Sequence, residues 1–168
     1  MAPLLLPFLP IFIVAATTAA TNSYSYLPVD PLSLRGLTAY DVLQAYNFPI
    51  GLLPKGSLGY DLDPRTGKFS AYFNGTCEFA LESYQISYKS TITGRISTNH
   101  LTELRGVSVK VLLFWINIIE VVRDGDEINF SVGIASASFD IGNFYICPQC
   151  GCGLNCNSSE IVRRKAFG

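Results

Sequence analysis

The sequence has no excess of charge of either sign, and this shortage excludes some partners. Its 12 Lys and Arg residues stand against 13 Asp and Glu residues, which gives a net charge of -1. A chain so nearly neutral gives no electrostatic reason to expect nucleic acid or an anionic membrane as a partner. We therefore expect no nucleic-acid partner.

Histidine is also scarce, because His100 is the only one in the chain. Any enzyme of the Ser-His-Asp or Cys-His type would have to use it as the base, and no G-x-S-x-G nucleophile elbow occurs in the sequence. The surrounding residues Thr98 to Leu101 are typical of a turn. We therefore expect His100 to be a solvated side chain. We also expect no catalytic residues, no metal site and no cofactor, and we favour a binding protein over an enzyme.

Charged residues are missing altogether from residues 1–20, where Pro7 and Pro10 interrupt the apolar run from Leu4 to Ala16. As a helix this run would span about 20 Å, which is short of the roughly 30 Å hydrocarbon core of a bilayer. Small residues follow it up to Ala20. We predict a signal peptide over residues 1–20, cleaved near Ala20, although no Lys or Arg precedes the apolar run. The alternative is a hydrophobic core segment.

No later run is long enough to cross a membrane. The apolar stretch Val111–Ile119 is bounded by Lys110 and Glu120, and the C-terminus is polar. We expect a secreted chain without integral membrane association, whose oligomeric state the sequence does not indicate.

The remaining chain divides into three parts by composition. Residues 21–37 are rich in Pro and Ser and indicate a linker, residues 38–146 form one domain, and residues 147–168 form a Cys-rich tail. A helix is predicted to begin at Thr38, where Thr38 and Asp41 resemble a capping box, and to end near Asn47.

Apolar residues then alternate with polar ones at the period of β-strands. No helix-length segment separates the strands, so parallel βαβ units are unexpected. We predict a mostly β fold, an antiparallel β-barrel-like single domain preceded by one short α-helix. The region 107–122 is expected to hold one long bent strand or two. In all we expect seven to nine strands, around residues 58–62, 69–73, 77–81, 84–88, 92–98, 107–122, 128–134 and 139–146.

The five cysteines are the most specific local feature. Cys147, Cys150, Cys152 and Cys156 are clustered, and Cys77 lies apart on a predicted strand. In a reducing compartment such a cluster would suggest zinc or an iron–sulfur centre, whereas an exported chain favours disulfides. We predict two disulfides within the tail and a buried free thiol at Cys77. The alternative is that Cys77 ties the tail to the domain and one tail thiol pairs with another chain.

Two N-glycosylation sequons begin at Asn74 and Asn157, and both matter only if the chain is exported. Asn74 is the stronger candidate, because Asn-Gly also indicates a turn. Asn157 directly follows Cys156.

Aromatic residues are plentiful in the predicted strands. Alternation places Tyr72 and Phe73 on opposite faces of one strand. The aromatic side chains either fill the core or line a cavity for an apolar ligand, as larger β-barrels allow. The sequence leaves both interpretations open.

Several short motifs occur in a fixed order along the chain, namely Phe48–Pro54, Gly67–Phe69, Cys77, Ile92–Ile96, Gly106–Lys110, Phe114–Trp115 and Ile128–Gly133. This ordered set resembles the plant family catalogued as domain of unknown function 538. The resemblance runs from about Thr38 to Ile146 and implies a β-barrel-like domain preceded by a helix. Suggestions for that family include similarity to lipid-binding bactericidal/permeability-increasing proteins, links to stress and growth, and hydrolysis of a pigment ester. None brings a catalytic motif that can be placed on this chain.

We therefore predict a secreted (apoplastic), non-enzymatic binding module for an apolar or lipid-like small molecule. Two alternatives remain open. One is an apoplastic structural or signalling protein that acts through its surface, and the other is an esterase-like hydrolase that depends on His100.

Overall fold

The computed structural model describes residues 36–81 and 83–154. The predicted signal peptide with its cleavage site near Ala20, most of the predicted linker, Cys156 and Asn157 lie outside these residues, so those predictions stand as made.

Helix α1 (Ala39–Ala45) begins where the sequence predicts it. The Thr38 hydroxyl accepts a hydrogen bond from the Asp41 amide (3.2 Å), and the Asp41 carboxylate accepts one from the Thr38 amide (2.8 Å). This reciprocal pair is a capping box. The Thr38 hydroxyl also donates to the Asp41 carboxylate (2.6 Å), and this bond, with that from the Thr38 amide, holds the pKa of Asp41 below its ordinary value. Asn47, in the left-handed region at φ 64°, follows the end of the helix.

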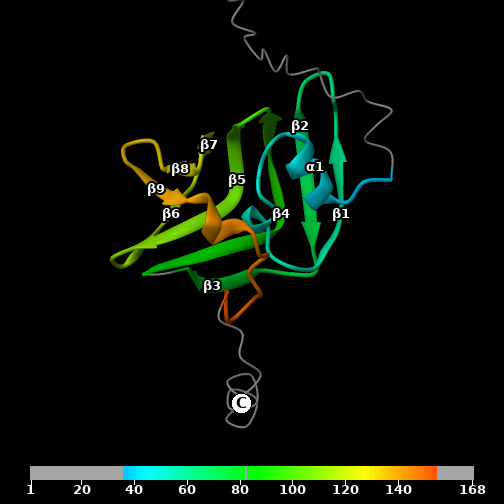
Figure 1. Cartoon of the computed structure of the whole chain (residues 1–168). Helices are drawn as coiled ribbons and strands as arrows, with labels where there is room; N and C mark the ends of the chain where they lie inside the picture. Colours follow the sequence, from blue (N-terminus) through cyan, green and yellow to red (C-terminus); the bar gives the residue numbers. More distant parts are fainter. Residues whose placement is uncertain (1–35, 82, 155–168) are drawn as a thin grey trace, which may run out of the picture.

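Strands make up most of the rest of the described chain (Figure 1). They are accompanied by two short 3-10 helices, η1 (Ile50–Leu52) and η2 (Ile141–Phe144). The strands are β1 (Ser57–Leu62), β2 (Lys68–Phe73), β3 (Cys77–Leu81), β4 (Tyr84–Ser97), β5 (His100–Val111), β6 (Phe114–Asn117), β7 (Glu120–Asp124), β8 (Glu127–Ser131) and β9 (Ser136–Asp140).

All nine strands belong to one antiparallel sheet, in the order β1-β2-β4-β5-β7-β8-β9, with β3 paired to β4 and β6 paired to β5. The predicted mostly β, antiparallel class with one α-helix is therefore confirmed. Within the described residues the sheet does not close, because its path starts at β1 and ends at β9 without a pairing between these two strands.

The long hairpin of β4 and β5 forms the centre of this sheet. The first half of β4 pairs with β3 and its second half with β2, while β5 carries β6 at one end and β7 at the other. The register between β4 and β5 shifts between Tyr88 and Thr93, and Gly106 lies opposite this shift at φ 91°. A Cβ at Gly106 would stand 2.5 Å from the Thr91 carbonyl oxygen, so a residue without one is needed at this bend. Figure 1 shows both strands curving through the middle of the molecule.

Three strand predictions need correction. The two strands expected at residues 84–88 and 92–98 are one continuous strand, β4. The region 107–122 contains a reversal at Leu112 and Leu113 and holds the end of β5, all of β6 and part of β7. The last strand ends at Asp140 rather than continuing to residue 146, because the Asp140 side chain accepts from the Gly142 amide and begins η2.

The core lies between the inner face of the curved sheet and the helical segments α1, η1 and η2. From α1 the side chains of Ala39, Val42 and Leu43 are buried in it. Arg123 on β7 donates to the Asn47 carbonyl oxygen (2.8 Å) and thereby ties the end of α1 to the sheet. Over residues 36–81 and 83–154, none of the helices has the length and apolar character needed to span a bilayer.

Candidate functional site

An apolar cavity of about 240 Å³ lies within the curved sheet. Strands β3, β4 and β5 line one side of it, and β8, β9 and η2 line the other. Pro148 and Leu154, from the segment after η2, complete the lining. The site is thus assembled from residues that are far apart in the sequence, on strands that the β4–β5 bend brings to face one another.

Six aromatic rings line this cavity, and most of them contact one another. Phe79 and Tyr88 are stacked with ring centroids 5.6 Å apart. On the other side Phe139 meets Tyr84 edge to face (5.5 Å) and Phe130 edge to face (5.8 Å). Such pairs stabilise the packing by about 0.5 to 1.5 kcal/mol each beyond their area burial, so the walls are held in place without a ligand. The lining rings are Phe79, Tyr84, Tyr88, Phe130, Phe139 and Phe144.

The lining of the cavity is mostly apolar, and besides its two tyrosines its polar side chains are Ser136 and Asn143. The hydroxyl of Tyr88 is turned to the backbone, where it donates to the Leu52 carbonyl oxygen at 3.0 Å. Full burial raises the pKa of Tyr88 far above its ordinary value, so the phenol stays neutral at all physiological pH values. Recognition in this cavity would therefore rest mainly on shape and apolar contact.

A second, smaller cavity of about 60 Å³ lies beneath α1. Val42 and Leu43 of the helix and Ile92 and Leu101 of the sheet are among its lining residues. Tyr88 lines both cavities and forms part of the wall between them. The smaller cavity is a gap in the packing of the core.

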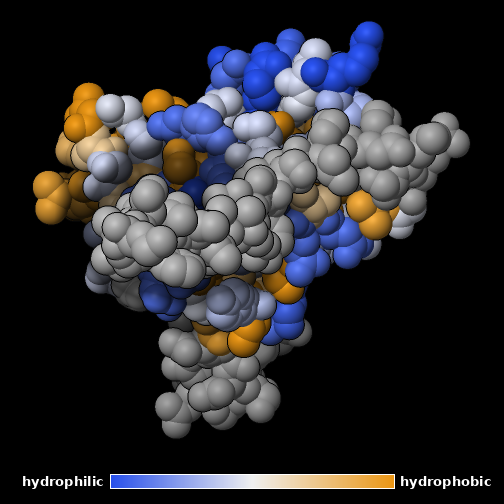
Figure 2. Space-filling view, turned by 45° about the horizontal axis from the view of Figure 1, so that its top comes forward, coloured by the Kyte–Doolittle hydropathy of each residue, from blue (hydrophilic) through white to orange (hydrophobic). Residues whose placement is uncertain are grey.

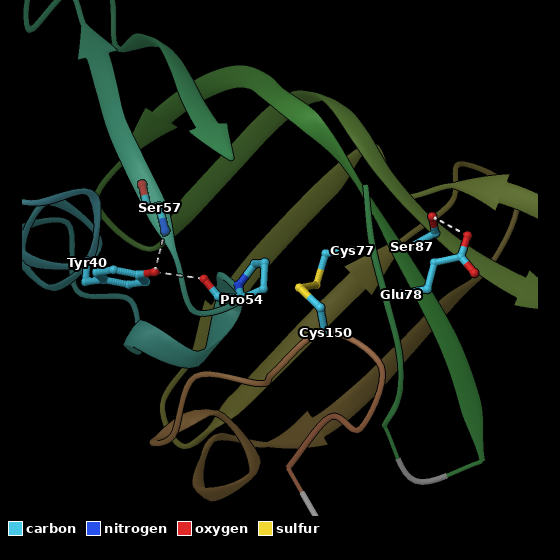
Figure 3. Close-up of a disulfide and its surroundings, with 7 residues drawn as sticks. All are labelled: Tyr40, Pro54, Ser57, Cys77, Glu78, Ser87 and Cys150. Atoms are coloured by element: carbon cyan, nitrogen blue, oxygen red, sulfur yellow. Dashed lines mark hydrogen bonds between the residues drawn. A yellow bond between two sulfur atoms is a disulfide. The ribbon is translucent and has the colours of Figure 1, made fainter. Parts of the chain in front are cut away.

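The tail segment 147–154 is held against the sheet beside the larger cavity. A disulfide joins Cys77 on β3 to Cys150, with Cα atoms 4.9 Å apart (Figure 3). The Gly151 amide donates to the Glu78 carbonyl oxygen (2.6 Å), and the Lys55 amide donates to the Pro148 carbonyl oxygen (2.9 Å). The segment that carries Pro148 and Leu154 to the cavity is thus fixed by both covalent and hydrogen bonds.

This disulfide corrects the cysteine prediction. Cys77 is buried as expected but is not a free thiol, because it ties the tail to the sheet, as the alternative interpretation held. Cys147 is a free thiol rather than a disulfide partner, and its Sγ donates to the Ile50 carbonyl oxygen at 3.4 Å. Burial raises its pKa, an effect that Lys55 partly offsets. Cys152 takes part in a disulfide, as predicted.

His100 is the first residue of β5, next to the turn in which it was predicted to lie. Its Nε2 lies 2.6 Å from a carboxylate oxygen of Glu120 on β7. The Ser97 hydroxyl nearby donates to the backbone carbonyl of His100 and not to its ring. In the part of the chain that the structure describes, the imidazole thus has an orienting carboxylate but no nucleophile.

Two further predictions concern the β2 region. Asn74 is exposed in the turn between β2 and β3, a position open to a glycosyltransferase. Tyr72 is half-exposed and bonds to Asp61, whereas Phe73 is buried, so the predicted opposite facing of these two rings is confirmed.

One surface feature was not predicted at all. The turn between β5 and β6 consists of Leu112 and Leu113, both exposed, and the exposed Phe114 follows them. In sequence this apolar run is typical of a buried strand. The only signal of a turn is the length of the alternating region, which exceeds that of an ordinary strand.

Comparison with known proteins places the fold in a family. Residues 39–145 match the family described as "Protein of unknown function, DUF538". An uncharacterized protein of Arabidopsis thaliana is 26% identical over 95 residues, which cover 56% of this chain and 55% of that protein. The chain thus matches about half the length of this relative. The family match runs from α1 through the strands to η2 and includes every aromatic residue of the cavity. The chain therefore belongs to the DUF538 family of proteins of unknown function.

Proposed function

We propose that the protein binds an apolar or lipid-like small molecule in the cavity of about 240 Å³. The observation that carries this proposal is the aromatic lining, which is largely without hydrogen-bonding groups. A dry apolar cavity of about 150 Å³ is enough to hold benzene, and pockets for drug-sized ligands start at roughly 300 Å³. A small apolar molecule, or one segment of an alkyl chain, is the ligand that fits.

The proposal includes a barrel-like role for the open sheet and an extracellular setting. The bent β4–β5 hairpin brings the two parts of the sheet to face each other, so the sheet acts as an incomplete barrel around the ligand. The Cys77–Cys150 disulfide is compatible with secretion, since such bonds persist in oxidising compartments. Export after cleavage near Ala20, and glycosylation at Asn74, belong to the same proposal.

The binding experiment uses N-phenyl-1-naphthylamine, an uncharged dye whose emission rises in apolar surroundings. Ala137 on β9 lines the cavity, and Ala137→Leu would fill part of it. Ala80 on β3 is exposed and absent from the lining, so Ala80→Leu adds the same atoms outside the cavity.

We expect saturable dye binding by the unaltered chain and by Ala80→Leu, and a loss of roughly tenfold or more in affinity for Ala137→Leu. The larger side chain takes the space that the ligand needs, and overpacking costs about 1 to 3 kcal/mol. Equal affinity in both variants would contradict binding in this cavity. It would favour the alternative of a structural or signalling protein that acts through its surface.

The hydrolase alternative has one supporting observation, the contact between His100 and Glu120. A carboxylate that orients a histidine is two parts of a catalytic triad, and the described residues supply no third. Hydrolysis of p-nitrophenyl acetate by the unaltered chain that disappears in His100→Ala would favour this alternative over binding alone. Retained hydrolysis would exclude triad chemistry.

A further inference from the structure

Hairpin β5–β6 projects from the sheet and carries apolar side chains at its turn. Leu112 is 88% exposed, Leu113 84% and Phe114 71%. With Val111 and Trp115, both also exposed, they form a continuous run that we name the apolar tip (residues 111–115). Figure 1 shows the hairpin reaching beyond the neighbouring strands, and Figure 2 shows hydrophobic residues gathered on the same side of the molecule. Exposing such a run is costly, so its surroundings in use are expected to be apolar.

At the projecting end of this hairpin, from Val107 to Asn117, the only charged side chain is the cation of Lys110. Lys110 stands next to the tip with its Nζ 6.0 Å from the centroid of the Trp115 ring. From Val107 to Asn117 the sequence contains no carboxylate. Ile134, 97% exposed, lies in the β8–β9 loop, which is uncharged. Both projections are thus free of the negative charge that would repel lipid phosphates.

We propose that the apolar tip inserts into the surface of a membrane that contains anionic lipid. Tryptophan and lysine are the side chains that favour the boundary between hydrocarbon and headgroups, where the indole lies flat and the ammonium reaches the phosphates. Here they stand directly behind the leucines and Phe114, in the order that shallow insertion requires. The balanced charge of the whole chain does not oppose this, because apolar insertion supplies most of the attraction and Lys110 adds to it locally.

The shape of the tip disfavours a second copy of the chain as its occupant. A stable protein interface takes about 20 to 30 residues from each partner. The apolar tip is a single hairpin turn with its two flanking strand ends, which is far below that number.

The inference goes beyond ligand binding and stands without it, but the two features are connected. Val111, at the base of the apolar tip, also lines the larger cavity, as do Val132 and Ala135, which flank Ile134. A tip seated in a membrane would therefore bring this cavity to the lipid surface.

Trp115 makes the test direct, because it is the only tryptophan of the chain. The full chain, purified from a eukaryotic secretory pathway, is mixed with vesicles of phosphatidylcholine and phosphatidylserine, and with vesicles of phosphatidylcholine alone. Tryptophan emission and cosedimentation are measured for the unaltered chain and for Leu112→Ser, Leu113→Ser and Lys110→Gln. The control is Leu58→Ser, which removes a leucine that is 70% exposed on β1, the first strand of the sheet path. All variants share every residue outside the substitution, so contributions from other segments cancel.

We expect a blue shift of Trp115 emission on mixed vesicles, and a loss of vesicle affinity of roughly tenfold for each tip leucine replaced. Lys110→Gln should cost about fivefold on mixed vesicles and nothing on phosphatidylcholine alone. Leu58→Ser should bind like the unaltered chain.

Two results would overturn the proposal. One is an unchanged emission maximum with mixed vesicles, or the same vesicle affinity in the tip variants as in Leu58→Ser. The other is a blue shift that grows with protein concentration in the absence of vesicles, together with a dimer in sedimentation velocity. That second result would assign the tip to self-association.

Discussion

Tyr88 on β4 donates a hydrogen bond from its buried hydroxyl to the carbonyl oxygen of Leu52, at the end of η1, over 3.0 Å. The bond joins two segments 36 residues apart and fixes one of the rings that line both cavities. It also satisfies two polar groups that would otherwise be buried without a partner. The wall of the larger cavity is thus held by a bond within the protein and not by a ligand.

Replacing Tyr88 by Phe should lower the free energy of unfolding by about 1 to 2 kcal/mol, because the Leu52 carbonyl loses its partner in a buried position. Tyr72→Phe is the control. It removes a half-exposed hydroxyl that bonds to Asp61, and should change stability by less than about 0.5 kcal/mol. Urea unfolding followed by circular dichroism measures both. Equal effects would contradict the importance of the buried bond.

The Cys77–Cys150 disulfide closes a loop with a sequence separation of 73 residues. Cys150→Ser should lower the free energy of unfolding by about 4 kcal/mol, since the open chain gains entropy when unfolded. Cys147→Ser, which removes the free thiol, is the matched control and should have little effect. A peptide map without reductant should recover Cys77 and Cys150 in one linked species. Finding both as free thiols would refute the assignment.

Cys147 should react slowly with iodoacetamide at neutral pH. The thiolate is the reactive form, and burial raises the pKa of this thiol above its ordinary value, so the folded protein holds it protonated over a wider pH range. The rate of alkylation should therefore begin to rise at a higher pH than that of a model thiol. In the same range stability should fall slightly, because the unfolded state ionises first. A rate profile that matches a free thiol would contradict the buried placement.

The capping box of α1 predicts a pH dependence of stability opposite to that of Cys147: its contribution is lost as pH falls. Thr38→Ala should cost about 1 kcal/mol at neutral pH, since the Asp41 amide loses its acceptor. The pKa of Asp41 is lowered by Thr38, so its contribution is present above the ordinary carboxyl pKa and disappears as pH falls through the lower, folded value. The difference between Thr38→Ala and the unaltered chain should shrink over that acidic interval. A difference that is constant with pH would contradict the reciprocal bond.

Much of this fold could be predicted from local sequence patterns. The capping box of Thr38 and Asp41, the Asn74–Gly75 turn and the alternation of Tyr72 with Phe73 depend on neighbours in sequence, and all three hold in the structure. The continuity of β4 was missed because polar residues between Tyr88 and Ile92 resemble a turn. They form the bulge where the hairpin bends.

The candidate site was only partly predictable. An aromatic-lined cavity was one of two open interpretations, and the choice depends on how β8 and β9 fold back toward β3, which no local pattern encodes. A disulfide from Cys77 to the tail was likewise only the alternative interpretation, and local patterns did not indicate Cys150 as the partner. The hydrophobic turn at Leu112 and Leu113 contradicts the ordinary rule that turns are polar, and residues that break such a rule at a projecting point are often functional.

Native mass spectrometry of the full chain, purified from a eukaryotic secretory pathway, tests the central claim most directly. The account predicts a species heavier than the polypeptide and its glycans by the mass of an apolar small molecule, which is released by mild activation and is reduced in Ala137→Leu but not in Ala80→Leu. The bare polypeptide in every preparation, with no adduct after incubation with N-phenyl-1-naphthylamine, would contradict it.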